Sequence, residues 1–135
     1  MEVWEDLDNM KTCPIEVALK YLGKKWTVQI IRDLFNGKKR FSEFLKANPQ
    51  ISTKMLSLRL VELQDSGLIK KKVFASTPVK IEYSLTQKGK ALNKVLFQLA
   101  DFSLNNFPSE VYYNEPKSIE RDVLNLRDFF KANRY

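Results

Sequence analysis

The segment "KANPQISTKML", residues 46–56, ends one helical run and begins another within a few residues. Pro49 disfavours helical dihedral angles at Asn48, so the preceding run ends there. Ser52 is a good N-cap for a second run over residues 53–65. The segment therefore predicts two helices joined by a tight corner, which turns the chain and presents the N-terminus of the second helix outward.

Helical periodicity also precedes this corner. Apolar residues recur at three- and four-residue spacing in residues 14–23, 24–37 and 41–47, and the first two runs end at a glycine. In the first of them the following residues share one face: Ile15, Ala18, Leu19 and Leu22. After the corner, residues 68–75 and 79–85 are rich in β-branched and aromatic residues, so a two-stranded hairpin is expected.

Two further helices are expected in the C-terminal third. Thr86 can cap a long helix from Gln87 to about Asn106, and residues 117–132 resume the helical period after a break. The order of elements predicts a mainly α fold with a small β-hairpin (α+β), a winged helix-turn-helix with long C-terminal dimerisation helices. The expected divisions are an N-terminal extension (1–11), the winged helix-turn-helix domain (12–86) and the dimerisation helices (87–135).

Positive charge is concentrated in the middle of the chain. Residues 11–90 carry 17 Lys/Arg against 6 Asp/Glu, a net charge of +11, whereas the first ten residues carry −4. Residues 91–135 balance at 6 against 6. This distribution favours a surface that binds a polyanion such as nucleic acid over a basic surface that only keeps the protein soluble.

Catalysis is a poor match to the composition, since the chain has no histidine and a single cysteine, Cys13. This removes histidine acid–base chemistry, Cys-His pairs and thiolate or imidazole zinc sites. We therefore expect no enzyme, no metal site and no cofactor. No apolar run approaches the 18 residues of a membrane span, and the acidic start lacks the apolar core of a signal peptide, so a cytoplasmic protein without a membrane partner is expected.

The helix after the corner has a buried and an outward side. Leu56, Leu60 and Leu63 define the buried side on a helical wheel. The outward side carries side chains that can hydrogen-bond bases or phosphates: Thr53, Lys54 and Ser57, next to the N-cap Ser52. Leu58 and Val61 also point outward, and contact with thymine methyl groups is as plausible for them as packing against another element.

Other basic residues flank this helix. Arg59, at the edge of the buried arc, can reach a phosphate or pair with Glu62 or Asp65. A cluster before residue 41 favours phosphate contact over a solvated charge run: Lys38, Lys39 and Arg40. In the hairpin, Lys70–Lys72 and Lys80 suit phosphate or minor-groove contact, and lysines also protect exposed edge strands.

An apolar stripe follows the predicted helix 87–106 and consists of Leu92, Val95, Leu96, Leu99 and Phe102. The DNA-binding unit needs only part of it as core, so the remainder suits a dimer seam. A two-fold dimer would place two recognition helices on two half-sites. The alternative is that the last helix folds back and covers the stripe.

Cys13 stands just before the first helix, beside Pro14 and near Lys11. A thiol at a helix N-terminus in a basic environment can be reactive, which would suit a sensor. The alternative is an ordinary small hydrophobic residue.

Several motifs together resemble the HxlR family of winged helix-turn-helix regulators, relatives of the MarR family. They are Cys13-Pro14, "GKKW", Arg40-Phe41, "IS.KML", "GLI" and "EYSLT..G", and the resemblance covers roughly residues 12–100. It implies a homodimeric transcriptional regulator, often a repressor, that binds double-stranded DNA at a pseudo-palindromic operator. The recognition helix would be about 52–66 and the wing about 68–85.

The resemblance also implies roles for individual residues. Its DNA contacts fall on Arg40, Ser52, Thr53, Lys54, Ser57, Arg59, Lys80 and the Ser76-Thr77-Pro78 tip. It implies oxidant or electrophile sensing at Cys13, which as a single thiol would act through an intersubunit disulfide, a mixed disulfide or alkylation.

This chain departs from the family pattern at two positions and in its tail. Val79 replaces the second proline usual at the wing turn, and Leu58 stands where similar sequences are commonly polar. The tail, residues 107–135, extends beyond the resemblance and is expected to cap the dimer. The exposed apolar pair Leu58 and Val61 supports an alternative function, a winged-helix module for protein interaction. No residue indicates a binding site for a small-molecule effector.

Overall fold

The computed structural model describes residues 9–132, and its elements follow the predicted order. The helices and strands are α2 (Pro14–Leu22), α3 (Thr27–Phe35), α4 (Phe41–Ala47), α5 (Thr53–Asp65), β1 (Ile69–Phe74), β2 (Lys80–Leu85), α6 (Gln87–Lys90), α7 (Asn93–Asn106), α8 (Pro108–Val111) and α9 (Ile119–Ala132). The mainly helical fold with one antiparallel hairpin is confirmed. Residues 1–8 of the predicted N-terminal extension, and residues 133–135, lie outside the described residues.

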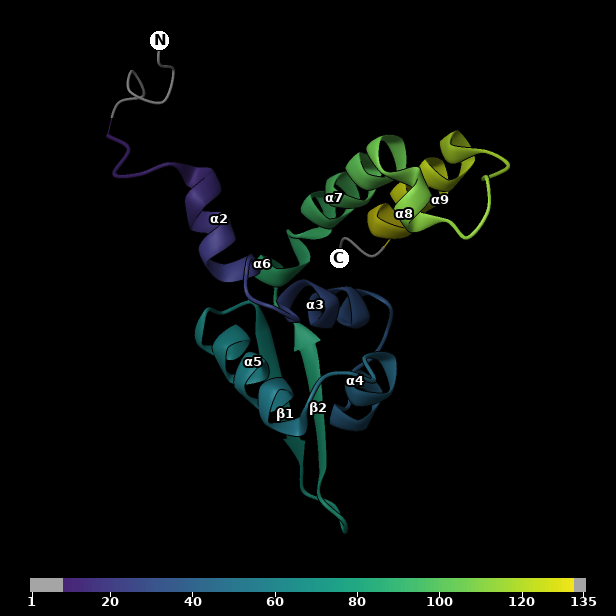
Figure 1. Ribbon diagram of the computed structural model, residues 1–135. Coiled ribbons are helices and arrows are strands. Elements are labelled where there is room, and N and C mark those ends of the chain that lie inside the picture. The colour runs from purple at the N-terminus through teal and green to yellow at the C-terminus, as the bar shows by residue number, and fades with distance from the viewer. Residues whose placement is uncertain (1–8, 133–135) are drawn as a thin grey trace.

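The helices α3, α4 and α5 and the hairpin form one body, and the hairpin projects beyond the helices at one end (Figure 1). From the opposite end two arms extend: α2 on one side, and α7 with α8 and α9 on the other. Among residues 9–132, no helix combines the length and the apolar character that a membrane crossing requires.

One hydrophobic core joins the three helices of the body. Its most deeply buried side chains are Ile30 and Ile31 of α3, Phe44 of α4, and Leu56 and Leu60 of α5. Each buried side chain of this size contributes about 1.5–3 kcal/mol to folding. The core therefore fixes α5 against α3 and α4 by its predicted buried side.

The predicted corner is confirmed, and a buried polar cluster holds it. Asn48 Nδ2 donates to Asp33 Oδ2 (2.7 Å) and to the Phe44 carbonyl oxygen (2.9 Å), and both Asp33 and Asn48 are buried. Ser52 Oγ accepts a hydrogen bond from the Met55 backbone N–H (3.0 Å), as expected of an N-cap. The turn between α4 and α5 is thus fixed from α3.

The hairpin is tied to the body at its base. Its register pairs Ile69 with Leu85 and Phe74 with Lys80. The Tyr83 backbone N–H donates to the Lys39 carbonyl oxygen (2.8 Å), so the segment before α4 runs beside β2. The base is buried and the far end is exposed, which leaves the tip free to project.

One prediction about the first helices needs correction, and the predicted shared face of α2 stays exposed. The helix predicted over residues 24–37 begins only at Thr27, because Trp26 takes a left-handed conformation (φ 77°) and serves as its N-cap. The apolar face predicted for α2 is not covered: Ile15 is 56% exposed, Leu19 is 59% exposed, and α2 has no buried residue.

The long helix predicted from Gln87 to Asn106 is interrupted at residues 91–92, giving α6 and α7. At the break the Leu92 N–H donates to the Gly89 carbonyl, three residues back, which tightens the turn and redirects the chain. Gly89 lies so close to β1 that an added Cβ would be 2.1 Å from the Leu68 carbonyl oxygen. The break therefore follows directly after a glycine that packs closely against the start of the hairpin.

Helix α9 folds back along α7 and reaches α3. The ring of Phe130 meets that of Phe35 edge to face at 5.6 Å between centroids, and Asn93 Nδ2 donates to the Phe130 carbonyl (3.3 Å). This packing buries Leu96, one of the residues predicted for the dimer seam, in the core of the chain. The alternative reading of the stripe, a covering last helix, thus holds for its inner side.

Candidate nucleic-acid interface

The outward face of α5 carries hydrogen-bonding side chains at its N-terminal end. Ser52, Thr53, Lys54 and Ser57 are exposed, while the opposite side of the helix is buried in the core. Leu56 marks that buried side with no exposed area. The face is rigidly held and open to a partner, as direct base readout requires.

Leu58 and Val61 are exposed further along the same helix, at 48% and 51%. Their exposure is as predicted. They form an apolar strip beside the polar end of α5, so both chemistries are available on one helix face.

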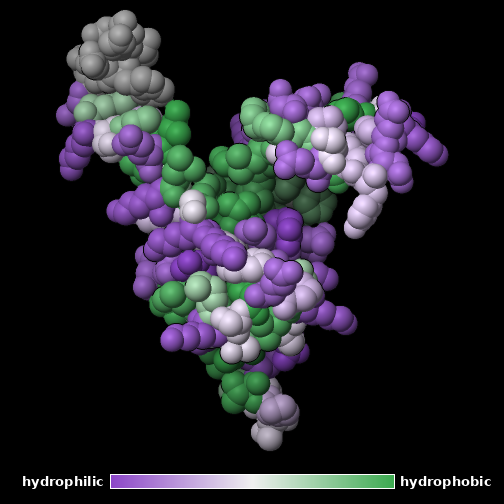
Figure 2. All heavy atoms as spheres, viewed as in Figure 1, coloured by the Kyte–Doolittle hydropathy of each residue, from purple (hydrophilic) through white to green (hydrophobic). Residues whose placement is uncertain are grey.

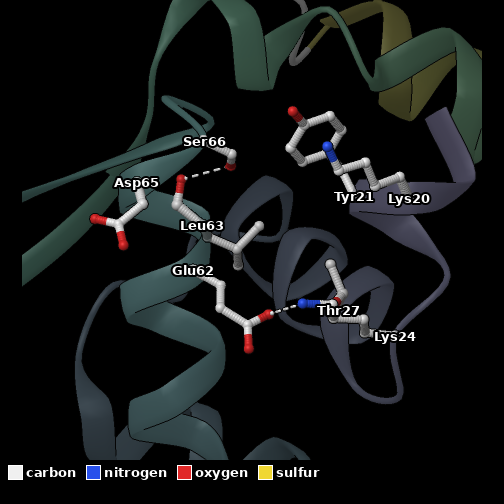
Figure 3. A pocket seen from close by; sticks show the side chains of 8 residues that line it. All are labelled: Lys20, Tyr21, Lys24, Thr27, Glu62, Leu63, Asp65 and Ser66. Carbon is white, nitrogen blue, oxygen red and sulfur yellow. Dashed lines mark hydrogen bonds and ion pairs between the residues drawn. The ribbon is translucent and has the colours of Figure 1, made fainter. Parts of the chain in front are cut away.

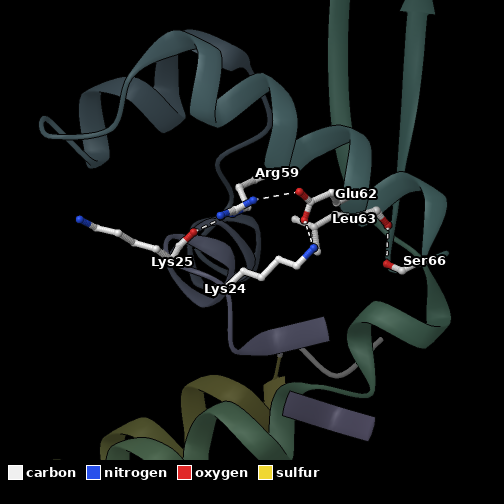
Figure 4. Close-up of polar contacts among 6 residues, drawn as sticks. All are labelled: Lys24, Lys25, Arg59, Glu62, Leu63 and Ser66. Atoms are coloured by element: carbon white, nitrogen blue, oxygen red, sulfur yellow. Dashed lines mark hydrogen bonds and ion pairs between the residues drawn. The ribbon is translucent and has the colours of Figure 1, made fainter. Parts of the chain in front are cut away.

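Arg59, one of the predicted DNA contacts, is held within the chain in this structure. Its Nε donates to the Lys25 carbonyl oxygen (2.8 Å) and its Nη1 pairs with Glu62 Oε1 (2.9 Å), as Figure 4 shows. Only 12% of the side chain is exposed. The pairing alternative, Glu62, is therefore the observed one, because the guanidinium is drawn inward to the α2–α3 connection.

Glu62 links α5 to that connection. Lys24 Nζ lies 3.0 Å from Glu62 Oε2, while Arg59 holds the other oxygen (Figure 4). The hydrogen bond from Lys24 lowers the pKa of Glu62 below its ordinary value. The pair spans a hollow of about 490 Å³ between α2 and α5, with Tyr21 on one wall and Asp65 on the other (Figure 3). A charged bridge beside a hollow thus ties the α2–α3 connection to α5.

The basic cluster before α4 is partly engaged within the chain. Lys39 Nζ lies 3.6 Å from Glu82 Oε2 on β2, whereas the Arg40 side chain is exposed. Glu43 accepts hydrogen bonds from the backbone N–H groups of Lys39 (3.1 Å) and Arg40 (3.0 Å), and the bond from Lys39 lowers the pKa of Glu43. Glu43 thus fixes the start of α4 and the position of Lys38 to Arg40.

The wing carries lysines around an aromatic ring. The ammonium groups of Lys72 and Lys80 lie 4.9 Å and 5.0 Å from the centroid of the Phe74 ring. Lys80 Nζ also lies 3.3 Å from Glu82 Oε2. Lys70 and Lys71 are exposed along β1, and Thr77 is exposed at the tip. The hairpin therefore offers positive charge along its length.

Cys13 is the N-cap residue of α2 and is partly buried. It therefore lies on the α2 arm, and α3 and α4 separate it from α5 along the chain. It is connected to α5 through α2 and the Lys24–Glu62 bridge.

Apolar surface lines the notch between the two arms. Hydrophobic side chains are visible at its base and along the inner parts of the arms (Figure 2). On α7, Val95, Leu99 and Phe102 are 39–59% exposed, and Leu92 is partly buried against the core. Within residues 9–132, no cluster of three or more His, Cys, Asp or Glu residues could hold a metal ion.

The sequence matches the HxlR-like helix-turn-helix family over residues 21–111, more than half of the chain. The chain belongs to this family. The HTH-type transcriptional regulator YdeP of Bacillus subtilis is 41% identical over 95 residues, which cover 70% of this chain and 74% of YdeP. YodB of the same species is 44% identical over 88 residues, covering 64% of this chain and 79% of YodB. These findings assign this HxlR-like chain to the helix-turn-helix transcriptional regulators.

Solved structures agree with this assignment. Reduced YodB from B. subtilis superposes with a TM-score of 0.65 at 40% identity and covers 71% of this chain and 95% of its own. The oxidised form of the redox regulator HypR gives 0.65 at 37% identity, covering 70% and 97%. The family resemblance and the winged fold expected from the motifs are therefore confirmed.

Sequence reasoning missed the residues that hold the HxlR-like domain in shape. Arg32, Asp33 and Asn48 form a hydrogen-bonded cluster, and Glu62 forms a bridge over 38 residues of chain. The one sequence signal for these contacts is Asp33, a carboxylate on an otherwise apolar face of α3.

Proposed function

We propose that this HxlR-like protein is a homodimeric repressor that binds a pseudo-palindromic duplex operator. The observation that carries the proposal is the outward face of α5, where Thr53, Lys54 and Ser57 stand exposed on a helix whose other side is fixed in the core. A helix of this kind fits the major groove, where each base pair presents a distinct pattern of donors and acceptors. The protein would act in the cytoplasm, without catalysis.

The proposed DNA contacts are of two kinds, base readout and phosphate binding. Thr53, Lys54 and Ser57 read base edges, and Leu58 contacts a thymine methyl group. Phosphate contacts come from residues that flank the helix or line the wing: Lys38, Lys39, Arg40, Ser52, Lys70, Lys71, Thr77 and Lys80. Arg59 is left out of the set, because its guanidinium is held by Lys25 and Glu62.

Exposed apolar helices support the homodimer. An isolated nine-residue helix is marginal in water, yet α2 has no buried residue and exposes Ile15 and Leu19. Leu99 and Phe102 of α7 expose apolar surface on the other arm. A second copy seated in the notch would cover both arms and space two copies of α5 for two half-sites.

Redox control through Cys13 is the finer part of the proposal. The solved neighbours include a redox regulator, HypR, and YodB after diamide treatment. In one route two Cys13 thiols give two protons and two electrons to an oxidant such as diamide and form one disulfide between subunits. In the other, one Cys13 thiolate attacks a small-molecule disulfide, releases one thiol and forms a mixed disulfide, or it adds to an electrophile. Either change acts on α2, and the connection that follows α2 bridges to α5 through Lys24 and Glu62.

Titration of labelled duplex tests the proposal. Duplex from upstream of the protein's own gene is compared with random duplex, with reduced and diamide-treated protein, at two salt concentrations. Tight, salt-dependent and selective binding is expected, with a shift on oxidation that Cys13→Ser abolishes. An unchanged shift in Cys13→Ser would remove the sensor role and leave DNA binding intact.

The second candidate function is a protein-interaction module, favoured by the exposed strip of Leu58 and Val61. Equal and weak binding to both duplexes would contradict the repressor and favour this module. The net charge of +11 over residues 11–90 supports the DNA-binding function instead.

A further inference from the structure

A hollow of about 370 Å³ lies at the base of the hairpin, beside the C-terminal end of α3. Its volume falls within the range of about 300–1,000 Å³ that small-molecule sites occupy. Four of its lining residues are buried in the core and form a fixed wall: Leu34, Phe35, Tyr83 and Leu85. The described residues that line it include none from the two arms, so the hollow belongs to the body of the molecule.

Lysines from three parts of the body converge on this hollow. Lys38 and Lys39 come from the segment between α3 and α4, Lys70 from β1, and Lys90 from α6. Ser84 of β2 adds an exposed hydroxyl that makes no hydrogen bond to a described residue. None of the described lining residues carries a carboxylate. The hollow is therefore lined by charges of one sign.

Most of this charge is not neutralised within residues 9–132. Of the four lysines only Lys39 forms an ion pair there, with Glu82 Oε2 at 3.6 Å, and Lys80 shares that carboxylate at 3.3 Å. Lys38 and Lys90 are partly buried and have no carboxylate partner among these residues. Partial burial reduces the screening of like charges by water, so the ammonium groups repel one another. An anion bound between them would relieve this repulsion.

The number and type of these cations select the class of anion. A lysine ammonium is a compact charge with three donors, and its hydrogen bonds to phosphate oxygens are strengthened by charge. A hollow lined by one sign of charge also concentrates the potential that attracts a counter-ion. A monovalent anion would offset only one of the four lysines, whereas a chain of phosphates offers charge and acceptors to all of them.

We infer that this hollow binds a short polyphosphate chain, either free or as the triphosphate group of a nucleotide. Lys38, Lys39 and Lys70 also belong to the proposed DNA contacts, whereas Lys90 and Ser84 do not. Binding of the polyphosphate does not depend on the proposed function. Competition between polyphosphate and DNA rests on that function, because both ligands would use the same three lysines.

Calorimetric titration of inorganic tripolyphosphate into the full chain, without DNA, tests the site. Sulfate at the same ionic strength is the comparison, since it carries fewer charges and acceptor oxygens. Tripolyphosphate is expected to bind once per chain and at least about tenfold more tightly than sulfate, because it makes more charge-assisted hydrogen bonds. Equal affinity for the two anions, or no saturable binding of tripolyphosphate, would overturn the site and leave four solvated lysines.

Two variants locate the anion. Lys90→Gln removes one lining charge and is expected to weaken tripolyphosphate binding by at least about tenfold. Its control is Lys94→Gln, the same change at an exposed position of α7 outside the hollow. Ser84→Glu places a carboxylate among the lysines and is expected to abolish binding, with Gln87→Glu as the control. If Lys90→Gln and Ser84→Glu both bind as the parent does, the anion lies elsewhere and the inference is wrong.

ATP and adenosine distinguish the two sources of the phosphate chain. Tighter binding of ATP than of tripolyphosphate would identify a nucleotide, and equal binding would identify the phosphate chain alone. Adenosine is expected not to displace tripolyphosphate, because it carries no phosphate. Displacement by adenosine would contradict a site built from lysines.

A competition experiment with duplex DNA separates this site from the proposed function. Tripolyphosphate is expected to displace duplex from the parent, and to do so less effectively from Lys90→Gln. Tripolyphosphate binding in a protein that has no DNA affinity would contradict the proposed repressor and leave the site standing. Selective duplex binding without any tripolyphosphate binding would overturn the site alone.

Discussion

The side chains of α5 have two different roles, and the residues with these roles lie one helical turn apart. Lys54 and Ser57 are exposed and free to meet a partner, whereas Arg59 and Glu62 tie the helix to the connection before α3. The distinction decides what each substitution measures. Loss of an outward group should change binding alone, and loss of an inward group should change stability first.

For Arg59→Ala we expect a loss of about 1–3 kcal/mol in the free energy of unfolding, because hydrogen bonds to the Lys25 carbonyl and to Glu62 disappear. Urea unfolding measures it. Lys54→Ala, at an exposed position of the same helix, is the control and should unfold as the parent does. An unfolding midpoint for Arg59→Ala equal to that of the parent would show that these contacts contribute little.

Asn48→Ala is expected to cost about 1–3 kcal/mol, because the buried Asp33 carboxylate loses a hydrogen bond at 2.7 Å and the corner before α5 loses its tie to α3. Chemical denaturation of the variant measures this cost. Gln50→Ala, exposed in the same turn, is the control. Equal stability of the two variants would show that the hydrogen bond from Asn48 to Asp33 does not stabilise the corner.

Local signals explain which parts of the element order were predictable. Pro49 and Ser52 act on their own neighbours, so the corner and the start of α5 could be placed from the sequence. The partner of Arg59 depends on Lys25, which is 34 residues away, and only the fold brings the two together. The break between α6 and α7 was equally hidden, since it depends on the contact of Gly89 with Leu68.

The α2–α3 connection is an element held to α5 by charge. Glu62 accepts from Lys24 and Arg59, and its pKa is below the ordinary 4.5, mainly through Lys24. A lowered folded-state pKa contributes stability at pH values above the ordinary one. That contribution is lost as pH falls through the folded-state pKa.

Acid titration of stability should therefore separate Glu62→Gln from the parent. The parent is expected to lose unfolding free energy as pH falls below about 4.5, and Glu62→Gln to lose less over the same range. Asp65→Asn serves as the control, because Asp65 makes no ion pair with a described residue. Parallel pH profiles for the parent and Glu62→Gln would contradict the bridge.

Gly89→Ala tests why α6 is separate from α7. A Cβ at this position would meet the Leu68 carbonyl oxygen at 2.1 Å, so the short helix must move off the sheet. We expect a loss of about 1–3 kcal/mol, as for overpacking in a core. Thermal unfolding would detect it, with Gln87→Ala at an exposed site of α6 as the control. An unchanged melting temperature would mean that α6 shifts freely.

At the scale of the whole molecule, a single chain leaves the apolar surface of its two arms exposed to solvent. The sequence showed an apolar face on α2 but could not show which chain covers it, because periodicity is the same for a core and for an interface. The fold shows what covers part of the apolar stripe on α7, since α9 buries Leu96 and leaves Phe102 exposed. The remainder is the surface assigned to the proposed dimer.

Phe102→Glu is expected to convert the dimer to a monomer, since it places a charge in the proposed apolar interface. Sedimentation velocity measures the change, and Gln50→Glu adds the same charge at an exposed position of the α4–α5 turn as the control. If Phe102→Glu stays dimeric, the interface lies elsewhere.

The measurement closest to the central claim compares operator and random duplex for substitutions in α5 and in the wing. If α5 reads bases, Ser57→Ala and Lys54→Ala should lower affinity for the operator by about 1–3 kcal/mol and hardly change affinity for random duplex. Lys70→Ala, on the wing, should weaken binding to both duplexes equally and lower the salt dependence by about one counterion. Equal losses on both duplexes for the α5 variants would contradict the assignment of α5 as the recognition helix.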